Sequence, residues 1–480
     1  MSKKTYRVRG KYVDGSGRGV VSFNHSMIPV PGLLPGELAE IELYRKKDET
    51  LGRLVTLVER SQQRVDDVCP YGEKCGGCQL WHMSYGEQLK YKQEQVQSLM
   101  GSFGKVPETI GMDDPQGYRH KIHGTFGRNS RGQIISGFYE EKSHRLLDMK
   151  RCRIQDGVAD DIMGAIRDGM KKLGIAPYDE DRRRGMLRHV LIRTGYRTGE
   201  IMVVFVLASF RFPQGKALCD QLIRKFPKIR TIVYNLNGGK TSMVLGDDQK
   251  VVYGEGYIED ELCGLRFRIS PKSFYQVNPE QTEKLYMKAV EMARLTAKDR
   301  VLDTYCGIGT ISLLVSRYVN QVTGVELNPD AIVDARENAK FNGITNVRFV
   351  HRDATRFMEE TAAKYLHSSA SHSQKQPMAA SEAAGAKDRK KDAIDFTDKS
   401  YYNVVIMDPP RSGSTPEFLK ALVKMAPEKV IYISCNPVTQ KRDMGLLIKS
   451  GYKVRAIQPV DMFPMTSGIE NIVLLERTAK

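Results

Sequence analysis

The sequence lacks any long apolar run. Its longest strongly apolar stretch, Ile201 to Phe210, is too short to cross a bilayer, which requires about 20 residues. The opening segment MSKKTYRVRGKYV contains basic residues but no apolar core, so no signal peptide is predicted. We therefore expect a cytoplasmic protein with no membrane partner.

Acidic residues are fewer than basic residues. The 480 residues include 74 Lys and Arg against 57 Asp and Glu, which gives a net charge of +17. Apolar residues make up 41% and charged residues 27%, a composition typical of folded rather than disordered chains. Because basic proteins bind phosphate backbones by counterion release, a nucleic acid is the partner that the charge favours. Nothing in the sequence implies a stable protein partner.

Histidine is scarce, and its nine copies show no metal-ligand spacing. Cysteine is clustered instead: CPYGEKCGGCQLW places Cys69, Cys75 and Cys78 in a C-x5-C-x2-C pattern. In a reducing compartment such clusters more often mean metal binding or catalysis than disulfides. Cys152, in MKRCRIQ, is the cysteine left over to serve as a fourth ligand. Four thiolates suit either zinc or an iron–sulfur cluster, and spacing does not choose between them.

Three consecutive parts are predicted from the pattern of the chain, since a chain of this length corresponds to two to four domains. Residues 1–60 contain short strands broken by Gly and Pro, typical of a small β-barrel that binds RNA. Residues 61–260 form a mixed α+β region with the cysteine cluster and an amphipathic helix at 85–100. Residues 261–480 alternate strands and helices, which predicts a doubly wound α/β sheet, interrupted by a disordered insertion at 366–400.

A nucleotide site is predicted at successive strand ends of the third part. In VLDTYCGIGTISL, Asp303 ends a strand, and Gly307 and Gly309 let the backbone approach a ligand closely. Glu326 ends the next strand, where a carboxylate can bind both ribose hydroxyls, and Asp353 ends the third, within reach of an adenine amino group. An acid, a glycine loop and two further acids in this order indicate S-adenosylmethionine.

A nucleophile is predicted in KVIYISCNPVT, where Cys435 follows a strand at the same sheet edge. Carbon 5 of a pyrimidine is a poor nucleophile, but addition of a thiolate at C6 produces an enolate whose C5 can attack a methyl group. The C5 proton must then leave, which requires a base, and Glu470 in SGIENI is the candidate. Asp408, in MDPPRSG, is expected to line the cofactor or base pocket.

These motifs resemble the RNA uracil-5-methyltransferases, in particular the TRAM-domain iron–sulfur branch that modifies 23S ribosomal RNA. The resemblance covers nearly the whole chain except 366–400. It implies a class I S-adenosylmethionine-dependent methyltransferase domain, an N-terminal OB-like TRAM barrel and an α+β central iron–sulfur domain. It also implies that a [4Fe-4S] cluster, rather than zinc, is held by Cys69, Cys75, Cys78 and Cys152.

The resemblance extends to single positions. In SPKSFYQVNPEQ, it implies that Gln276 contacts S-adenosylmethionine and that Phe274 holds the flipped uracil. It gives Cys435 the role of nucleophile and Glu470 that of proton acceptor. Further positions that match cofactor contacts are Tyr305, Thr310, Glu326, Asp353 and Asp408. The chain departs from the family at Gly468, where a histidine is usual, and at Asn471, where the residue is usually apolar or small.

Four alternatives stay open. A methyltransferase for uracil 54 of tRNA would share every catalytic residue. A radical methylthiotransferase also pairs a TRAM domain with a cluster, but its C-x3-C-x2-C triad differs from the spacing of five and two found here. An amino-group methyltransferase could use DPPR without Cys435. A non-catalytic RNA-binding protein would need neither the acids at the strand ends nor Cys435.

Overall fold

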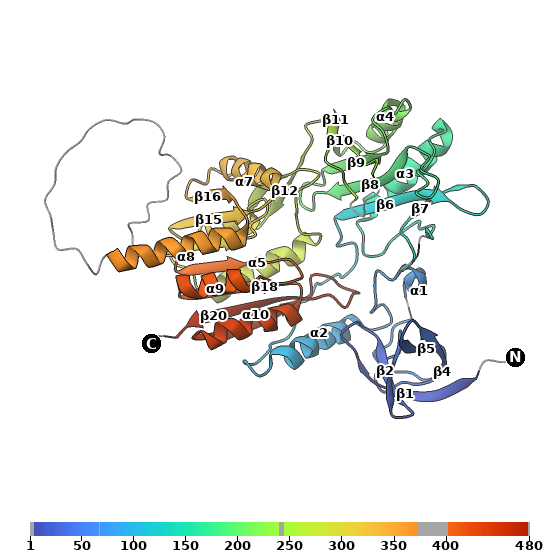
Figure 1. Ribbon diagram of the computed structural model, residues 1–480. Coiled ribbons are helices and arrows are strands. Elements are labelled where there is room, and N and C mark those ends of the chain that lie inside the picture. The colour runs from blue at the N-terminus through green and yellow to red at the C-terminus, as the bar shows by residue number, and fades with distance from the viewer. Residues whose placement is uncertain are drawn as a thin grey trace. The chain divides into compact units, whose positions relative to one another are not determined.

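The computed structural model describes residues 4–66, 68–141, 143, 145–239, 244–371 and 402–478 (Figure 1). Its internal contacts divide the chain into two compact units. The first comprises Met1–Leu285 and Gln458–Asn471, and the second comprises Tyr286–Ile457 and Ile472–Lys480. A short segment near the C-terminus therefore belongs to the unit formed mainly by the N-terminal half.

An antiparallel five-stranded sheet opens the first unit, in the order β3-β2-β1-β4-β5. Its inward side chains include Val8, Val21, Val30 and Ile41, which form a core of their own. The two outer strands pack together: a Cβ on Gly52 of β5 would lie 2.7 Å from a methyl of Val30 on β3, so only glycine fits there. The strands are β1 (Thr5–Val13), β2 (Gly19–Phe23), β3 (Ser26–Val30), β4 (Leu38–Lys46) and β5 (Glu49–Glu59).

A six-stranded sheet forms the middle of the first unit, in the order β11-β10-β9-β8-β6-β7. Helices α3 and α4 cover one face, where alternate residues of the strands build the core (Figure 1). The strands are β6 (Lys121–Arg128), β7 (Ile134–Gly137), β8 (Leu187–Thr194), β9 (Ile201–Leu207), β10 (Ile229–Leu236) and β11 (Gln249–Tyr253). The other elements are α1 (Gly72–Cys75), α2 (Tyr85–Met100), α3 (Gly157–Leu173), α4 (Gly215–Lys225) and the hairpin β12 (Ile258–Leu262) and β13 (Leu265–Ile269).

A seven-stranded sheet is the frame of the second unit, in the order β16-β15-β14-β17-β18-β20-β19. Strand β14 pairs in parallel with β15 on one side and β17 on the other, so the order reverses at β14. In such sheets ligands bind outside the carboxyl ends of the strands at the point of reversal. The strands are β14 (Arg300–Thr304), β15 (Gln321–Glu326), β16 (Val347–His351), β17 (Val404–Met407), β18 (Lys429–Ser434), β19 (Tyr452–Val460) and β20 (Glu470–Arg477). The helices are α5 (Pro279–Ala293), α6 (Thr310–Val315), α7 (Pro329–Phe341), α8 (Ala354–Ser371), α9 (Pro416–Met425) and α10 (Pro437–Lys449).

The predicted doubly wound sheet is confirmed by this topology. Helix α8 continues to Ser371, so the first residues of the predicted insertion are helical, whereas 372–400 lie outside the described residues. Within the described ranges, no helix is long and apolar enough to span a membrane.

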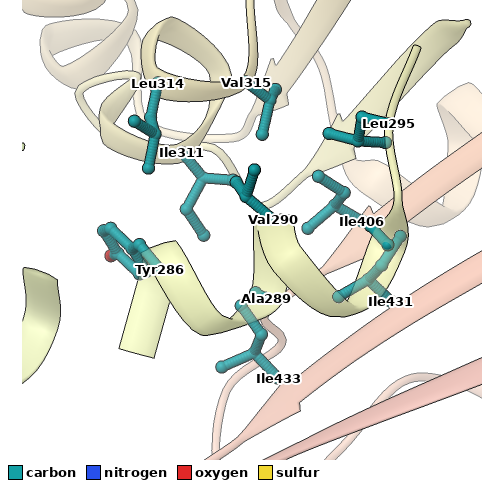
Figure 2. A pocket seen from close by; sticks show the side chains of 11 residues that line it. Tyr286, Ala289, Val290, Leu295, Ile311, Leu314, Val315, Ile406, Ile431 and Ile433 are labelled. Atoms are coloured by element: carbon teal, nitrogen blue, oxygen red, sulfur yellow. The ribbon is translucent and has the colours of Figure 1, made fainter. Parts of the chain in front are cut away.

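A small cavity lies between α5, α6 and the seven-stranded sheet (Figure 2). Its walls are almost entirely aliphatic, with Ile311 and Leu314 from α6 and Ile406, Ile431 and Ile433 from the strands. Because it offers a charged ligand almost no polar partner, it belongs to the packing of the core rather than to the candidate site.

Candidate functional site

The glycine loop between β14 and α6 leaves room beside its backbone. Tyr305, Gly307 and Gly309 all have positive φ, at 67°, 55° and 86°. A Cβ on Gly309 would lie 2.8 Å from the ring of Phe349, so that position requires glycine. At Gly307 no heavy atom lies within 4 Å of where a Cβ would stand. The loop can therefore receive a ligand directly against its backbone.

Glu326 is fixed beside this loop at the end of β15. Its carboxylate accepts hydrogen bonds from the backbone N–H of Gly307 at 3.1 Å and of Asn328 at 2.8 Å. Asp353 follows β16 and accepts a hydrogen bond from the backbone N–H of Arg356 at 3.0 Å, which caps α8. The parallel pairing of β14, β15 and β16 places Asp303, Glu326 and Asp353 at one edge of the sheet, as predicted.

Acidic charge accumulates at this edge. Asp303 is 1% exposed and accepts a hydrogen bond from the Ser312 hydroxyl at 2.5 Å. Burial raises the pKa of Asp303 to about 7, and the charges of Asp408 and Glu326 act in the same direction. Burial of its carboxyl likewise raises the pKa of Asp408 to about 7. An edge lined by acids whose negative charge is costly favours a ligand that brings positive charge.

Tyr305 and Thr310 lie at the two ends of the glycine loop. The Tyr305 hydroxyl is 3.5 Å from the Ser414 hydroxyl, and its ring packs against Phe418 with centroids 5.8 Å apart. Thr310 begins α6, and its hydroxyl lies 3.4 Å from that of Tyr286. Both side chains are thus held by the second unit's own core.

Cys435 follows β18 at the same sheet edge and is half-buried. The next residue, Asn436, caps α10 by accepting from the backbone N–H of Val438 at 3.2 Å. The Asn436 amide also donates to the carbonyl of Arg411 at 3.0 Å. This bond ties the cysteine turn to the loop that begins at Asp408, and β17 and β18 run parallel side by side. Asp408 and Cys435 therefore follow the carboxyl ends of two neighbouring parallel strands.

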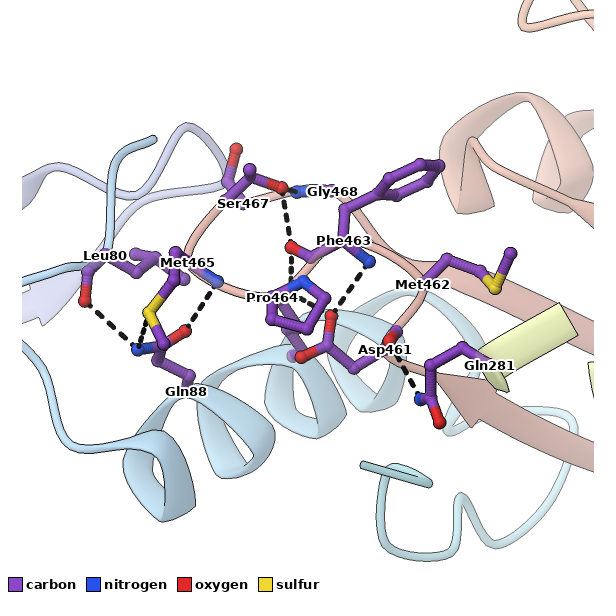
Figure 3. A network of polar contacts seen from close by, with 12 residues as sticks. Leu80, Gln88, Gln281, Asp461, Met462, Phe463, Pro464, Met465, Ser467 and Gly468 are labelled. Carbon is purple, nitrogen blue, oxygen red and sulfur yellow. Dashed lines mark hydrogen bonds and ion pairs between the residues drawn. The ribbon is translucent and has the colours of Figure 1, made fainter. Parts of the chain in front are cut away.

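Glu470 belongs to the first unit, where it begins β20 and is 4% exposed. The loop before it, residues 461–469, is anchored by a polar network (Figure 3). Lys92, buried in α2, contacts Asp461 at 2.5 Å and donates to the carbonyl of Phe463 at 3.1 Å. The Gln281 side chain donates to the carbonyl of Asp461 at 2.8 Å. The loop is thus fixed at its start by two helices.

The segment after the cysteine cluster holds the middle of the same loop. The backbone N–H groups of Gln79 and Leu80 both donate to the carbonyl of Met465 at 3.0 Å. The Met465 N–H donates to the Gln88 side chain at 3.0 Å (Figure 3). No signal in the sequence identifies these anchors, because they lie nearly 400 positions away from the loop.

Gly468 and Asn471 lie on either side of Glu470, and both have side chains of other residues close to them. A Cβ on Gly468 would lie 3.2 Å from the ring of Phe463 and 3.3 Å from the Thr466 hydroxyl, so a side chain there would require these two neighbours to move by a few tenths of an ångström. Asn471 is fully buried, with its amide nitrogen 3.3 Å from the sulfur of Met100 at the end of α2. The departure at Asn471 thus places a polar side chain against the end of α2.

Phe274 is 65% exposed, although its neighbours are fixed. The carbonyl of Ser273 accepts from Arg193 at 2.8 Å, and the Tyr275 hydroxyl lies 3.4 Å from Asp260. Gln276, two positions on, is half-buried. The structure thus places Phe274, Gln276 and Glu470 in the first unit, and Asp408 and Cys435 in the second.

Comparison with known proteins gives the family. A family model described as tRNA (Uracil-5-)-methyltransferase matches residues 238–368 and 376–478. An uncharacterized RNA methyltransferase of Halalkalibacterium halodurans is 40% identical over 466 residues, which cover 96% of this chain and 94% of the relative. One of Staphylococcus aureus is 38% identical over 464 residues, covering 95% of each. The chain belongs to the RNA uracil-5-methyltransferase family.

A solved structure confirms the fold of this methyltransferase. The Pyrococcus abyssi tRNA (uracil-54, C5)-methyltransferase in complex with S-adenosyl-L-homocysteine matches with a TM-score of 0.74 and 24% identity, covering 98% of this chain and 100% of that one. The predicted class I methyltransferase fold is thereby confirmed, and the family confirms an RNA methyltransferase, whose predicted methyl donor is S-adenosylmethionine. The acids and the open Gly307 backbone fit this cofactor, which carries a sulfonium and an ammonium group.

The four predicted cysteine ligands of the methyltransferase gather in one place. Cys69, Cys78 and Cys152 pack on a cluster around Trp81 and Tyr118. Burial raises the pKa of Cys78 to about 12, and the charges of Cys152, Cys75 and Cys69 act in the same direction. Burial also raises the pKa of Cys152 to about 11. Across the described part of the chain, no three His, Cys, Asp or Glu side chains are arranged to hold a metal ion.

Proposed function

We propose that this methyltransferase transfers a methyl group from S-adenosylmethionine to C5 of a uridine in 23S ribosomal RNA, with Cys435 as the nucleophile and Glu470 as the base. The observation that carries the proposal is the placement of Cys435. It follows β18 beside Asp408, at the edge that carries the glycine loop and the acids. The amino end of α10, which begins two positions further on, stabilises the negative charge of a thiolate nucleophile.

The chemistry follows from these residues. The sulfur of Cys435 bonds to C6 of the uracil, and the electron pair of the C5–C6 double bond moves onto C5 and the O4 carbonyl. S-adenosylmethionine supplies the electrophilic methyl group, which C5 takes. Glu470 then removes the C5 proton, the C5–C6 double bond re-forms, and Cys435 leaves as a thiolate. Because the uracil must reach the sulfur, it leaves its stack, and the exposed Phe274 provides a surface for it.

The cofactor contacts are part of the same proposal. Glu326, fixed by two backbone amides, binds the ribose hydroxyls, and Asp353 binds the adenine amino group. Asp408 lines the cofactor or base pocket. The remaining contacts come from Gln276, Tyr305 and Thr310.

A ribosomal substrate is favoured by the N-terminal half. The five-stranded sheet of residues 5–59 has contacting outer strands, which supports an OB-like TRAM barrel in the proposed RNA-binding domain 1–60. The proposed central domain is 61–260, and the catalytic domain is 261–480. The alternative is a tRNA uracil-5-methyltransferase, which the similarity to the Pyrococcus abyssi tRNA (uracil-54, C5)-methyltransferase favours. The non-catalytic alternative does not agree with the family.

A [4Fe-4S] cluster held by Cys69, Cys75, Cys78 and Cys152 is the proposed use of the gathered thiols. Four thiolates are the donor set of such a cluster and also of zinc, and in this structure no three of the described side chains are arranged around a metal ion. Iron, acid-labile sulfide and zinc should be measured in anaerobically purified protein. Four iron atoms per chain that are lost in Cys78→Ser would support the cluster. One zinc atom per chain, without iron or sulfide, would overturn the cluster and show that the thiols bind zinc.

The substrate is tested by methylation in vitro. Purified enzyme and labelled S-adenosylmethionine are incubated with unmodified 23S rRNA and, separately, with unmodified tRNA, and 5-methyluridine is mapped by mass spectrometry. We expect methyl groups in 23S fragments. Methyl groups found in tRNA alone would show that tRNA is the substrate. The absence of methyl groups from both RNAs would overturn the proposed activity.

A further inference from the structure

A strained turn lies in the loop that precedes Glu470. Met465 has a φ of 68°, in the left-handed region that residues with a side chain rarely adopt. Such a conformation persists only where the surrounding structure holds it. The N–H of Met465 donates to the Gln88 side chain at 3.0 Å (Figure 3). Its carbonyl accepts from the N–H groups of Gln79 and Leu80, both at 3.0 Å. Contacts from outside the loop therefore hold this turn.

The side chain of Gln79 connects two backbones. Its amide nitrogen donates to the carbonyl of Gly76, between Cys75 and Cys78, at 2.8 Å. Its oxygen accepts from the N–H of Ser467 at 3.2 Å. Ser467 lies three positions before Glu470. Gln79 thus holds the part of the loop that leads from the strained turn to the proposed base.

Little space is left for Gln79 to move. In the turn between β1 and β2, Gly17 has a φ of 79°, and a Cβ there would lie 2.9 Å from that of Gln79 and 3.5 Å from that of Ser467. The hydroxyl of Tyr118, a buried residue, donates to the carbonyl of Pro464 at 3.0 Å. All of these residues belong to the first unit, which also contains Glu470. The loop is thus packed and hydrogen-bonded on both sides of the strained turn.

We propose that Gln79 is a positioning residue for Glu470, because it holds the loop at Ser467 and thereby sets where the carboxylate stands. The inference rests on the proposed function, in which Glu470 is the base, and names the side chain that places it. Glu470 takes the C5 proton, whereas Gln79 acts only through the loop. Since a base must stand within hydrogen-bond reach of the proton that it removes, a small displacement of the loop slows this step.

The test compares Gln79→Met with Gln79→Glu and with Gln93→Met. Methionine keeps the length of the side chain but removes both hydrogen bonds, whereas glutamate keeps an oxygen that can accept from Ser467. Gln93 is the matched control, since it is a half-buried glutamine of α2 whose amide donates to the carbonyl of Val106 at 3.1 Å. Turnover is measured on the unmodified RNA, a 23S rRNA fragment or tRNA, that the wild type methylates.

Proton removal follows methyl transfer, so its slowing has a distinct kinetic signature. We expect Gln79→Met to lower kcat about tenfold while kcat/KM, which reports the steps up to methyl transfer, stays near that of the wild type. An RNA–enzyme complex that survives denaturation should accumulate during turnover. Gln79→Glu should restore most of kcat, and Gln93→Met should turn over as the wild type does.

Hydrogen exchange measured by mass spectrometry tests the contact without turnover. In Gln79→Met, a peptide of residues 461–471 should exchange faster than in the wild type, whereas in Gln93→Met it should not. Unchanged exchange or an unchanged kcat in Gln79→Met would overturn the inference while methylation by the wild type stands. A joint loss of kcat/KM and melting temperature would also overturn it, because Gln79 would then only stabilise the fold. A wild type that methylates no RNA would contradict the proposed function and, with it, this inference.

Discussion

Asp303 is a buried carboxylate whose pKa of about 7 lies well above the ordinary value near 4. Between those two pH values the folded state binds more protons than the unfolded state, so the free energy of unfolding falls as pH rises from about 4 to about 7. We expect Asp303→Asn to remove this loss and to stabilise the cofactor-free protein at pH 8 by up to about 4 kcal/mol. Calorimetry at pH 5 and pH 8 should show a larger gain at pH 8. A gain independent of pH would contradict the assignment.

Glu470 is the residue whose replacement should separate the two halves of the reaction. In Glu470→Gln the thiol of Cys435 can still add to the uracil, but the C5 proton has no base to accept it. We expect product formation to fall by about 10²-fold or more and RNA-bound enzyme to accumulate. A denaturing gel with labelled RNA measures this. Glu476→Gln, a partly exposed glutamate of the same strand, is the control and should turn over normally. Normal turnover by Glu470→Gln would remove its role as base.

At the scale of elements, the buried pair of Lys92 and Asp461 connects α2 to the loop before Glu470. Removal of one partner leaves an uncompensated buried charge, which costs about 3–5 kcal/mol. We expect Lys92→Met to lose about this much free energy of unfolding in urea, and Lys92→Met/Asp461→Asn to recover part of it. Lys90→Met, an exposed position of the same helix, should change little. An unchanged stability in Lys92→Met would show that the pair does not fix the loop.

The elements were the most predictable part of the molecule, because their periodicity is local. The helix expected at 85–100 is α2, and the alternation after residue 280 is the observed sheet. The acids at the strand ends were predictable for the same reason: parallel strands deliver their carboxyl ends to one edge. The anchors of the 461–469 loop were not, since Lys92 and Asp461 are 369 positions apart and each is an ordinary charged residue in sequence.

At the scale of the whole molecule, each of the two compact units comprises two separate segments of the chain. The segment Gln458–Asn471, which contains Glu470, belongs to the first unit, while Tyr286–Ile457 and Ile472–Lys480, which contain most of β19 and β20, belong to the second. The predicted boundaries at 60 and 260, and the predicted packing of helix 85–100 on the catalytic domain, stay predictions. Composition and periodicity report only on neighbours in sequence, so they do not show that Gln458–Asn471 returns to the first unit. The roles assigned to single residues stay predictions, and they meet in one chemical event, the bond between Cys435 and uracil C6.

That bond can be trapped. With RNA that carries 5-fluorouridine at the target, the C5 fluorine cannot be removed as a proton is, so the enzyme stays attached after methyl transfer. We expect the wild type with S-adenosylmethionine to give a covalent complex that survives denaturation and whose peptide maps to Cys435. Cys435→Ala should bind the same RNA and S-adenosylhomocysteine but form no complex, whereas Cys263→Ala should behave as the wild type. Turnover of this RNA without an adduct, or an adduct formed by Cys435→Ala, would contradict the account.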